Sequence, residues 1–597
     1  MEPGMTMLIH LVRRFARDDR GVFAVIFGLC AIAIIALAGS VVDFVSMQQA
    51  RNRAQIALDA ATLALQPEIF RTNLTQAQIR ERAQALVVER LADNRITAEI
   101  DTINVDVPNG SLFLQGTVDV PMIFVSLVGV THMEVPIYAE ATRKNLALEV
   151  VMVLDNSGSM NDQNRMTYLK QAASCATRIL FYDEVNSTTC LPINGTEKKE
   201  NVKIGIVPFT TMVNVGSQYA NASWVDRLGL ASKTRDNFDN DDNMFSTFNG
   251  PVDRIALFGR IGTSWKGCME ARDYPFSTND AAPSAADPRT LFTPAFAVDE
   301  PDGDNSYRNS YLDDSPNSCR QMIDATCSCT VTVQRVCSWF GCWNDTVRNC
   351  SLSALGRTQS NSTCNCGNQN SGTRNCTIRV DKVELLYPRE RQERLCKYNP
   401  GNVISGNGPN DGCPAARILA LTTNDSSVVS AISAMEANGG TNIHQGTIWG
   451  YRALSPTAPF TEGVAYNEDA TSKVMIVMTD GENTFYTANN INNARFNQAY
   501  GFPANQREGD GSSSDYSMAR RMDTLLLESC TNAKNDGIKV YTIGLATGST
   551  SNPTAIRQLL RNCSSGTDYA YFPNQPNELQ DVFLSIAGQL AQLRLAQ

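Results

Sequence analysis

The spacing of hydrophobic residues changes along the chain, and each pattern predicts a different element. Residues 21–42 contain no charge, and at about 1.5 Å per residue a helix of that length crosses a hydrocarbon core of about 30 Å. The next segment, to residue 66, is rich in Ala, Gln and Arg and predicts that the helix continues. Thr75 to Asp93 has apolar residues at helical spacing with Thr75 as a cap. Three alternating segments follow, two of them joined by the turn signal Pro108-Asn109-Gly110, so we expect a small α+β region over 67–143.

From residue 145 onwards, apolar strand patterns alternate with helical patterns, which favours a parallel sheet covered on both faces. The alternation stops over residues 211–419, where Asn, Asp, Ser, Thr, Gly and Cys dominate. Because an unstructured loop of that size is improbable inside a domain, we expect an inserted Cys-rich subdomain. The predicted fold class is α/β: a doubly wound, mostly parallel sheet over 145–210 and 420–597 with a large disulfide-rich insertion, preceded by the membrane helix and the small α+β region.

Charges around the first apolar segment predict its orientation. Four arginines (Arg13, Arg14, Arg17 and Arg20) precede it, and the first charge after it is Asp43. The positive-inside bias therefore places residues 1–20 in the cytoplasm and the bulk of the chain outside the inner membrane, in the periplasm or beyond. A cleaved signal peptide is the alternative, because Ala36-Leu37-Ala38 offers a small-x-small site, but the apolar segment exceeds the usual 7–15 residues.

Cysteine usage agrees with an exterior location. Of 17 cysteines, Cys30 lies in the apolar segment and 16 follow it, twelve of them between Cys268 and Cys413. An even number in an oxidising compartment predicts disulfides, although their connectivity cannot be deduced and a structural zinc cluster of thiolates is the alternative. Trp339, Phe340 and Trp343 are expected to pack in the small core of the insertion rather than to form an exposed contact patch.

Charge and histidine content exclude several function classes. The chain has 51 Lys and Arg against 61 Asp and Glu and a pI near 5.1, with no basic stripe, so nucleic acid is not an expected partner. The three histidines, His10, His132 and His444, lie far apart, which leaves little material for a catalytic triad or a His-rich zinc site. We expect no catalytic residues, and His444 is expected at a surface or interface.

Two predicted strands end in an acidic residue, and both are followed by a turn with glycine. "VVMVLD" delivers Asp155 and "VMIVMTD" delivers Asp480, while Ser157, Ser159 and Thr441 add hydroxyls on neighbouring turns. Carboxyl ends of parallel strands share one edge, where ligands bind. Any one of these residues alone reads as a turn or helix cap. Together, as carboxylates and hydroxyls without imidazole or thiol, they predict a divalent-cation site with Mg²⁺ as first choice and Mn²⁺ or Ca²⁺ as alternatives.

The pattern Asp155-x-Ser157-x-Ser159, with Thr441 and Asp480 on later loops, resembles the metal-ion-dependent adhesion site (MIDAS) of von Willebrand factor A (VWFA) domains, which have a Rossmann-like fold. The resemblance implies a metal held by the hydroxyls directly and by the aspartates partly through water, with one position open to an acidic residue of a protein partner. The N-terminal segment to residue 66 resembles the anchor of TadE/TadG-like proteins of tight-adherence (Flp) pilus assembly, particularly TadG. Ile26 stands where related pseudopilins carry the Glu used in processing, which favours a retained anchor.

These resemblances imply a membrane-anchored binding protein that acts in pilus assembly or cell adhesion, with pilus assembly components as partners. Two alternatives remain open from the sequence. One is an envelope VWFA protein that regulates or senses another membrane complex, and the other is a metal-dependent hydrolase. The identity of the partner, the preferred metal and the oligomeric state lie beyond the sequence.

Overall fold

The computed structural model divides the chain into two compact units, Met1–Asn145 with Gln592–Gln597, and Leu146–Ala591. It describes residues 20–70, 75–93, 95–106, 111–142, 147–186, 188–239, 251–303, 305–404, 406–468, 471–507 and 514–593. The predicted cytoplasmic segment up to residue 19, with His10, and the turn at 108–110 lie outside these residues.

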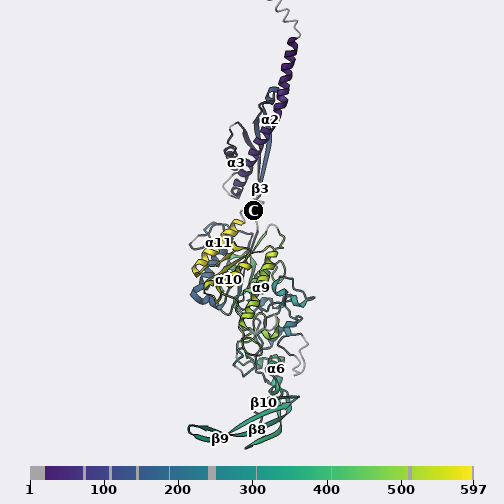
Figure 1. Ribbon diagram of the computed structural model, residues 1–597, viewed down its shortest axis with the longest axis vertical. Coiled ribbons are helices and arrows are strands. Elements are labelled where there is room, and N and C mark those ends of the chain that lie inside the picture. Colours follow the sequence, from purple (N-terminus) through teal and green to yellow (C-terminus); the bar gives the residue numbers. More distant parts are fainter. Residues whose placement is uncertain are drawn as a thin grey trace, which may run out of the picture. The chain divides into compact units, whose positions relative to one another are not determined.

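The first unit begins with one long helix, α2 (Arg20–Leu65), which Figure 1 draws in purple. Over Val25–Leu65 it is long and apolar enough to cross a membrane. A short 3-10 turn, η1 (Gln66–Phe70), leads towards α3 (Gln76–Leu91). The cap predicted at Thr75 is confirmed, because its hydroxyl accepts the backbone N–H of Gln78, whose side chain accepts the N–H of Thr75 in return.

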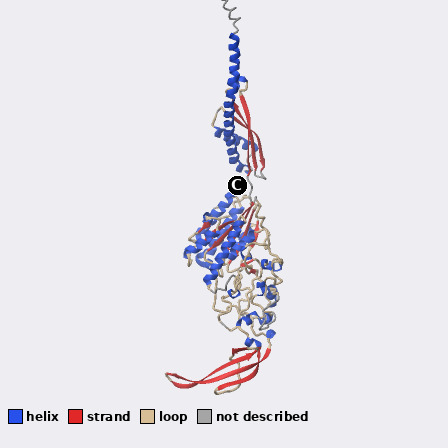
Figure 2. Cartoon of the chain, turned by 45° about the vertical axis from the view of Figure 1, so that its right-hand side comes forward, coloured by secondary structure: helices blue, strands red, loops and turns tan. Residues whose placement is uncertain are grey.

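Three antiparallel strands complete this unit in the order β1, β2, β3, and they are seen beside the lower part of the helix in Figure 2. They are β1 (Thr97–Asp106), β2 (Ser111–Pro121) and β3 (His132–Thr142), with the 3-10 turn η2 (Val125–Val128) between the last two. The core joins one face of the sheet to α3 and to the second part of α2, where Ala50, Ala54, Ala57 and Ala61 form a buried stripe. Alanine at this helical spacing lets the strands approach the helix closely.

The second unit is built on a sheet with the strand order β15-β14-β13-β4-β5-β6-β7, and β12 pairs with β5. Its five parallel strands confirm the predicted doubly wound sheet, whereas the antiparallel edge was not anticipated from the sequence. The parallel strands are β4 (Ala147–Asp155), β5 (Val202–Phe209), β13 (Thr471–Thr479), β14 (Lys539–Gly544) and β15 (Ala570–Tyr571), and the antiparallel ones are β6 (Val213–Asn214), β7 (Cys268–Met269) and β12 (Leu419–Thr422).

Helices cover both faces of this sheet, as the strand patterns predicted. Val151 and Val153 of β4 share a core with residues of α8 and α9. Successive strand residues point to opposite faces, so Val150 and Met152, which are fully buried, must be covered from the other side. The helices are α4 (Arg165–Phe181), α7 (Asp425–Ser433), α8 (Ile443–Leu454), α9 (Asp515–Asn535), α10 (Pro553–Cys563) and α11 (Leu579–Leu593).

The segment predicted as an insertion has two parts, and its predicted limits, 211 and 419, stay a prediction. One part, with α5 (Arg254–Arg260) and α6 (Pro388–Glu393), supplies buried aromatics such as Phe292, which packs against Trp449 of α8. The other part is a separate antiparallel sheet in the order β10-β9-β8-β11, visible as the extended strands labelled in Figure 1. Its strands are β8 (Met322–Ser338), β9 (Gly341–Ala354), β10 (Arg357–Ser360) and β11 (Gly372–Asp381).

The predicted disulfides are confirmed: the sixteen cysteines after Cys30 form eight bonds. Twelve of these cysteines pair with one another within the insertion, where the sulfurs of Cys327, Cys329 and Cys364 come close together. Each of the three is already bonded, which leaves the alternative of a thiolate zinc cluster without ligands. The bonds are Cys175–Cys190, Cys268–Cys413, Cys319–Cys396, Cys327–Cys364, Cys329–Cys350, Cys337–Cys342, Cys366–Cys376 and Cys530–Cys563.

The expectation for the aromatic group of the insertion was wrong. Trp339 and Phe340 are 97% and 95% exposed at the turn between β8 and β9, and Trp343 is about half exposed. The core of this small sheet is made by cysteines and by leucines such as Leu352 and Leu385 near the other end of the strands. The hairpin tip therefore projects the aromatic rings into solvent, and their role as a contact patch stays a prediction.

Candidate metal centre

The two acidic strand ends predicted from the sequence lie side by side. β4 and β13 are neighbouring parallel strands, with Leu154 opposite Met478. Asp155 and the residues that follow Met478 therefore reach the same edge of the sheet. The hydroxyl of Thr479 donates to Asp155 Oδ2 at 2.7 Å, which ties the two strand ends together.

The turn after β4 brings both serines towards the second aspartate. The backbone N–H of Ser157 donates to Asp155 Oδ1 at 2.8 Å, so the chain folds back at once. The hydroxyls of Ser157 and Ser159 then lie 3.0 Å apart, and Ser159 donates to Asp480 Oδ1 at 2.6 Å. Ser157, Ser159 and Asp480 thus form one chain of hydrogen-bonded oxygens, and the backbone N–H of Ser157 joins Asp155 to it.

The fifth residue, Thr441, lies on the loop between α7 and α8. This loop contacts the turn that carries Ser157 and Ser159, because the backbone N–H of Gly158 donates to Gly439 O at 2.9 Å. A Cβ at position 158 would lie 3.2 Å from that oxygen, so a glycine suits the close approach. Thr441 is buried, and its backbone is held by Thr484 in both directions. Among the described contacts, Thr441 is connected to the other four residues through the backbone of its loop, by the bond between Gly439 and Gly158, and not through its hydroxyl.

Burial and like charge dominate the electrostatics of this edge. Asp155 is fully buried, and desolvation together with the negative charge of Asp480 raises its pKa to about 7, against the opposing hydrogen bonds from Ser157 and Thr479. Arg165, the first residue of α4, donates to Asp480 Oδ2 at 2.8 Å. Sequence reasoning missed Arg165 and Thr479, because neither carries a signal beyond its helix or strand.

The donor set fits a hard divalent cation. All five predicted ligands offer oxygen. When Asp155 and Asp480 are both ionised, the guanidinium of Arg165 offsets one of the two negative charges, which leaves one at a buried edge of the sheet. Mg²⁺ prefers carboxylate, hydroxyl and water oxygens and commonly keeps positions for outside ligands. The residues that would hold it are Asp155, Ser157, Ser159, Thr441 and Asp480, and the ion would supply a coordination position for an oxygen of another molecule.

A cleft of about 160 Å³ lies next to the loop that precedes Thr441. It is lined by Asn438 and Gly439 of that loop and by insertion residues that include Arg308 and Asp411. The guanidinium of Arg308 stacks over the ring of Phe496 at 5.3 Å. Burial raises the pKa of Asp411, and the charge of Arg308 opposes that shift. The insertion thus contributes charged groups beside the candidate metal edge.

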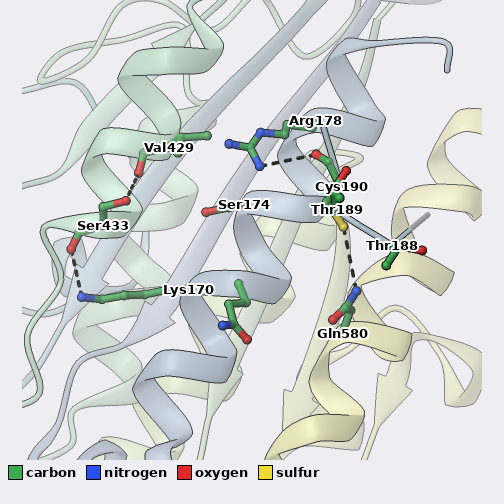
Figure 3. A pocket seen from close by; sticks show the side chains of 10 residues that line it. Lys170, Ser174, Arg178, Thr188, Thr189, Cys190, Val429, Ser433 and Gln580 are labelled. Atoms are coloured by element: carbon green, nitrogen blue, oxygen red, sulfur yellow. Dashed lines mark hydrogen bonds between the residues drawn. The ribbon is translucent and has the colours of Figure 1, made fainter. Parts of the chain in front are cut away.

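A larger cavity, of about 540 Å³, lies between α4, α7 and α11 (Figure 3). Its two cations already donate to backbone carbonyls: Lys170 to Ser433 at 2.9 Å and Arg178 to Cys190 at 3.4 Å. The residues that line it include no carboxylate and no histidine, and the amine of Lys170 is engaged by the Ser433 carbonyl.

The expectation that His444 lies at a surface or interface was wrong, because the residue lies in the protein interior. Its ring is fully buried, Nε2 lies 3.1 Å from the carbonyl oxygen of Ser277, and Nδ1 lies 2.7 Å from the hydroxyl of Tyr500. A carbonyl only accepts, so Nε2 carries the proton that is donated to Ser277. Burial lowers the pKa of His444 to about 3, and the charges of Arg452 and Arg521 add to that effect.

Comparisons with known proteins give matches of two kinds. No curated protein sequence matches the chain. Among solved structures, the pilus adhesin SpaC from Lactobacillus rhamnosus GG is 11% identical (83% of this chain, 34% of that chain, TM-score 0.27). The vWF domain of the type V pili tip protein Mfa5 from Porphyromonas gingivalis is 10% identical, and the match covers 75% of this chain and 95% of that chain with a TM-score of 0.27. Proximal thread matrix protein 1 from the mussel byssus, with a zinc-occupied MIDAS motif, is 14% identical, and the match covers 28% of this chain and 30% of that chain with a TM-score of 0.18.

The chain spans about a third of the length of the SpaC structure. Residues 21–66 match the family model described as "Putative Flp pilus-assembly TadE/G-like". The matched residues coincide with nearly all of α2, which runs from Arg20 to Leu65. The chain therefore carries a TadE/G-like segment, of the kind named for Flp pilus assembly, at its N-terminal helix.

Proposed function

We propose that this chain is an extracytoplasmic binding protein, anchored in the inner membrane by α2, that uses a divalent cation to bind a protein partner in Flp/Tad pilus assembly or cell adhesion. The cation, Mg²⁺ first, would be held by Asp155, Ser157, Ser159, Thr441 and Asp480. The observation that carries the proposal is the run of oxygens from Ser157 through Ser159 to Asp480, beside the buried carboxylate of Asp155.

The proposal is also supported by the presence of the candidate metal site and the TadE/G-like N-terminal segment in the same chain. The TadE/G-like match links the chain to a pilus-assembly family, and eight disulfides are typical of a protein exposed to an oxidising compartment. A cation with an open position favours a partner that presents a carboxylate, since carboxylate oxygens are preferred ligands of Mg²⁺. Arg308 and Asp411 of the neighbouring cleft would then contact the residues that flank that carboxylate.

The metal site is tested by titrating Mg²⁺ into the purified full chain in detergent, with calorimetry as the readout. We expect one binding event in the wild-type protein and none in Asp155→Ala. Asp162→Ala is the matched control, because Asp162 is an exposed acid on the same turn, seven residues further along the chain. Retention of the binding heat in Asp155→Ala, or its loss in Asp162→Ala alone, would contradict the site.

The partner is tested by capture from detergent-solubilised membranes. We expect pilus assembly components to be retained by the wild-type chain in Mg²⁺ and released by EDTA, and not to be retained by Asp155→Ala. A partner that stays bound in EDTA would show that recognition does not pass through the cation.

A regulatory or sensing role in another membrane complex uses the same cation chemistry, and the identity of the captured partner separates the two roles. Metal-dependent hydrolysis is less well supported by this geometry. The histidine nearest in sequence to the cluster, His444, is buried and engaged at both ring nitrogens by Tyr500 and Ser277. It is therefore not available to activate a water molecule at the metal edge.

A further inference from the structure

The connection between β2 and β3 is unusually apolar for an exposed segment. Residues 120–131 contain no charged side chain. Ile123, Leu127 and Val128 are 72%, 54% and 60% exposed. Exposed apolar side chains that follow one another closely in this way mark a surface that contacts a membrane or a protein partner.

This connection lies against the end of the apolar part of α2. An ideal Cβ at Gly39 would lie 2.2 Å from Cγ of Phe124, so the absence of a side chain at position 39 lets the phenyl ring pack on the helix. Four residues further on, the buried carboxylate of Asp43 accepts the backbone N–H groups of Ile123, Phe124 and Val125 at 2.8–3.2 Å. These contacts fix the connection at the level where the uncharged run 21–42 ends.

The backbone of the connection is largely satisfied within the first unit, which a segment in lipid requires. Besides the three donors to Asp43, four others bond inside the connection itself, and the hydroxyl of Ser126 donates to Ile123 O at 2.6 Å. The four bonds run from Met122 N to Thr131 O, Leu127 N to Phe124 O, Gly129 N to Ser126 O and Val130 N to Val125 O.

Polarity changes sharply on the side away from the apolar run. A cleft of about 310 Å³ begins at Ile123 and continues along the first unit to Arg53 and Arg95. Arg53 lies ten residues beyond Asp43, about 15 Å along the helix at 1.5 Å per residue. An apolar zone followed within that distance by charged side chains, Arg53 and the ion pair of Arg95 with Asp93, matches the change from lipid to water at a bilayer surface.

We propose that residues 122–130 insert into the extracytoplasmic leaflet of the bilayer beside α2, so that the first unit contacts lipid through two elements. The occupant is lipid because the connection packs against α2 at Gly39 and Asp43, and the neighbouring helix residues Val41, Val42 and Phe44 are themselves exposed where the uncharged run ends. Two membrane contacts fix the rotation of the first unit about the helix axis, which one helix leaves free. The proposal is independent of the metal site and requires that α2 crosses the membrane.

The test measures nitroxide accessibility in the full chain, reconstituted in nanodiscs of phosphatidylethanolamine and phosphatidylglycerol. Each label is placed on a single cysteine in a Cys30→Ser background, because Cys30 is the free cysteine. Leu127→Cys probes the connection and Leu37→Cys probes the exposed apolar surface of α2. Tyr138→Cys is the matched water-side control: it is exposed on β3, and its carbonyl accepts from Gln55, about 18 Å beyond Asp43 along the helix.

We expect oxygen accessibility to exceed that of a water-soluble nickel complex at Leu127 and Leu37, and the reverse at Tyr138. A Leu127 label that reads as water-exposed while Leu37 reads as lipid-exposed would overturn the proposal. A Leu127 label protected from both reagents would overturn it in favour of a protein partner on this surface. A water-exposed Leu37 label would overturn the membrane helix and the proposal together, whereas loss of Mg²⁺ binding would leave both intact.

Discussion

His444 makes the stability of the second unit depend on pH. Its pKa is about 3 in the folded protein against an ordinary value of 6.5, because burial excludes the charged ring. Below pH 6.5 the unfolded chain binds a proton that the folded chain refuses, so stability is full above that pH and falls as the pH is lowered towards 3. Between pH 7 and pH 4 this amounts to about 3 kcal/mol, at 1.36 kcal/mol per pKa unit.

The variant His444→Gln removes this proton and keeps a donor and an acceptor near Ser277 and Tyr500. We expect the wild-type chain to lose about 3 kcal/mol more than the variant between pH 7 and pH 4. The assay is urea unfolding of the purified chain followed by tryptophan fluorescence, since Trp224, Trp265 and Trp449 are buried in the same core. His132→Gln is the control, because His132 is exposed on β3. Equal losses in the wild-type chain and in His444→Gln would refute the reasoning.

Two further predictions concern the insertion and the disulfides. Replacing Trp339 and Phe340 together by alanine is expected to shift the unfolding free energy by less than about 0.5 kcal/mol, because both rings are almost fully exposed. The transition temperature is measured by calorimetry, and a large fall would mean that the rings pack against the protein. Replacing Cys175 and Cys190 together by serine opens a loop that the disulfide closes at a separation of 15 residues. The free energy of unfolding, measured in urea, is expected to fall by about 3 kcal/mol. An unchanged midpoint would show that this bond does not constrain the unfolded chain.

Part of the metal edge could be foreseen from single strands. Asp155 and Asp480 end apolar runs, and parallel strands bring such ends to one edge whatever the loops do. The positions of Ser157 and Ser159 follow from the same turn, because their spacing of two places both side chains on one side. Arg165 and the cleft with Arg308 could not be foreseen, since their approach depends on how α4 and the insertion pack against the sheet.

The sequence by itself determined the periodic elements, the parallel sheet, the oxidised cysteines and the length of α2, because these depend on local propensity, on residue type and on the alternation of elements. Only the tertiary structure decided what lies inside and what lies outside. His444 is enclosed because Ser277 and Tyr500, from distant segments, close over it. Trp339 and Phe340 are exposed because the hairpin extends beyond its own core. Burial is set by contacts between residues far apart in the chain, and a single sequence does not encode those contacts in any local pattern.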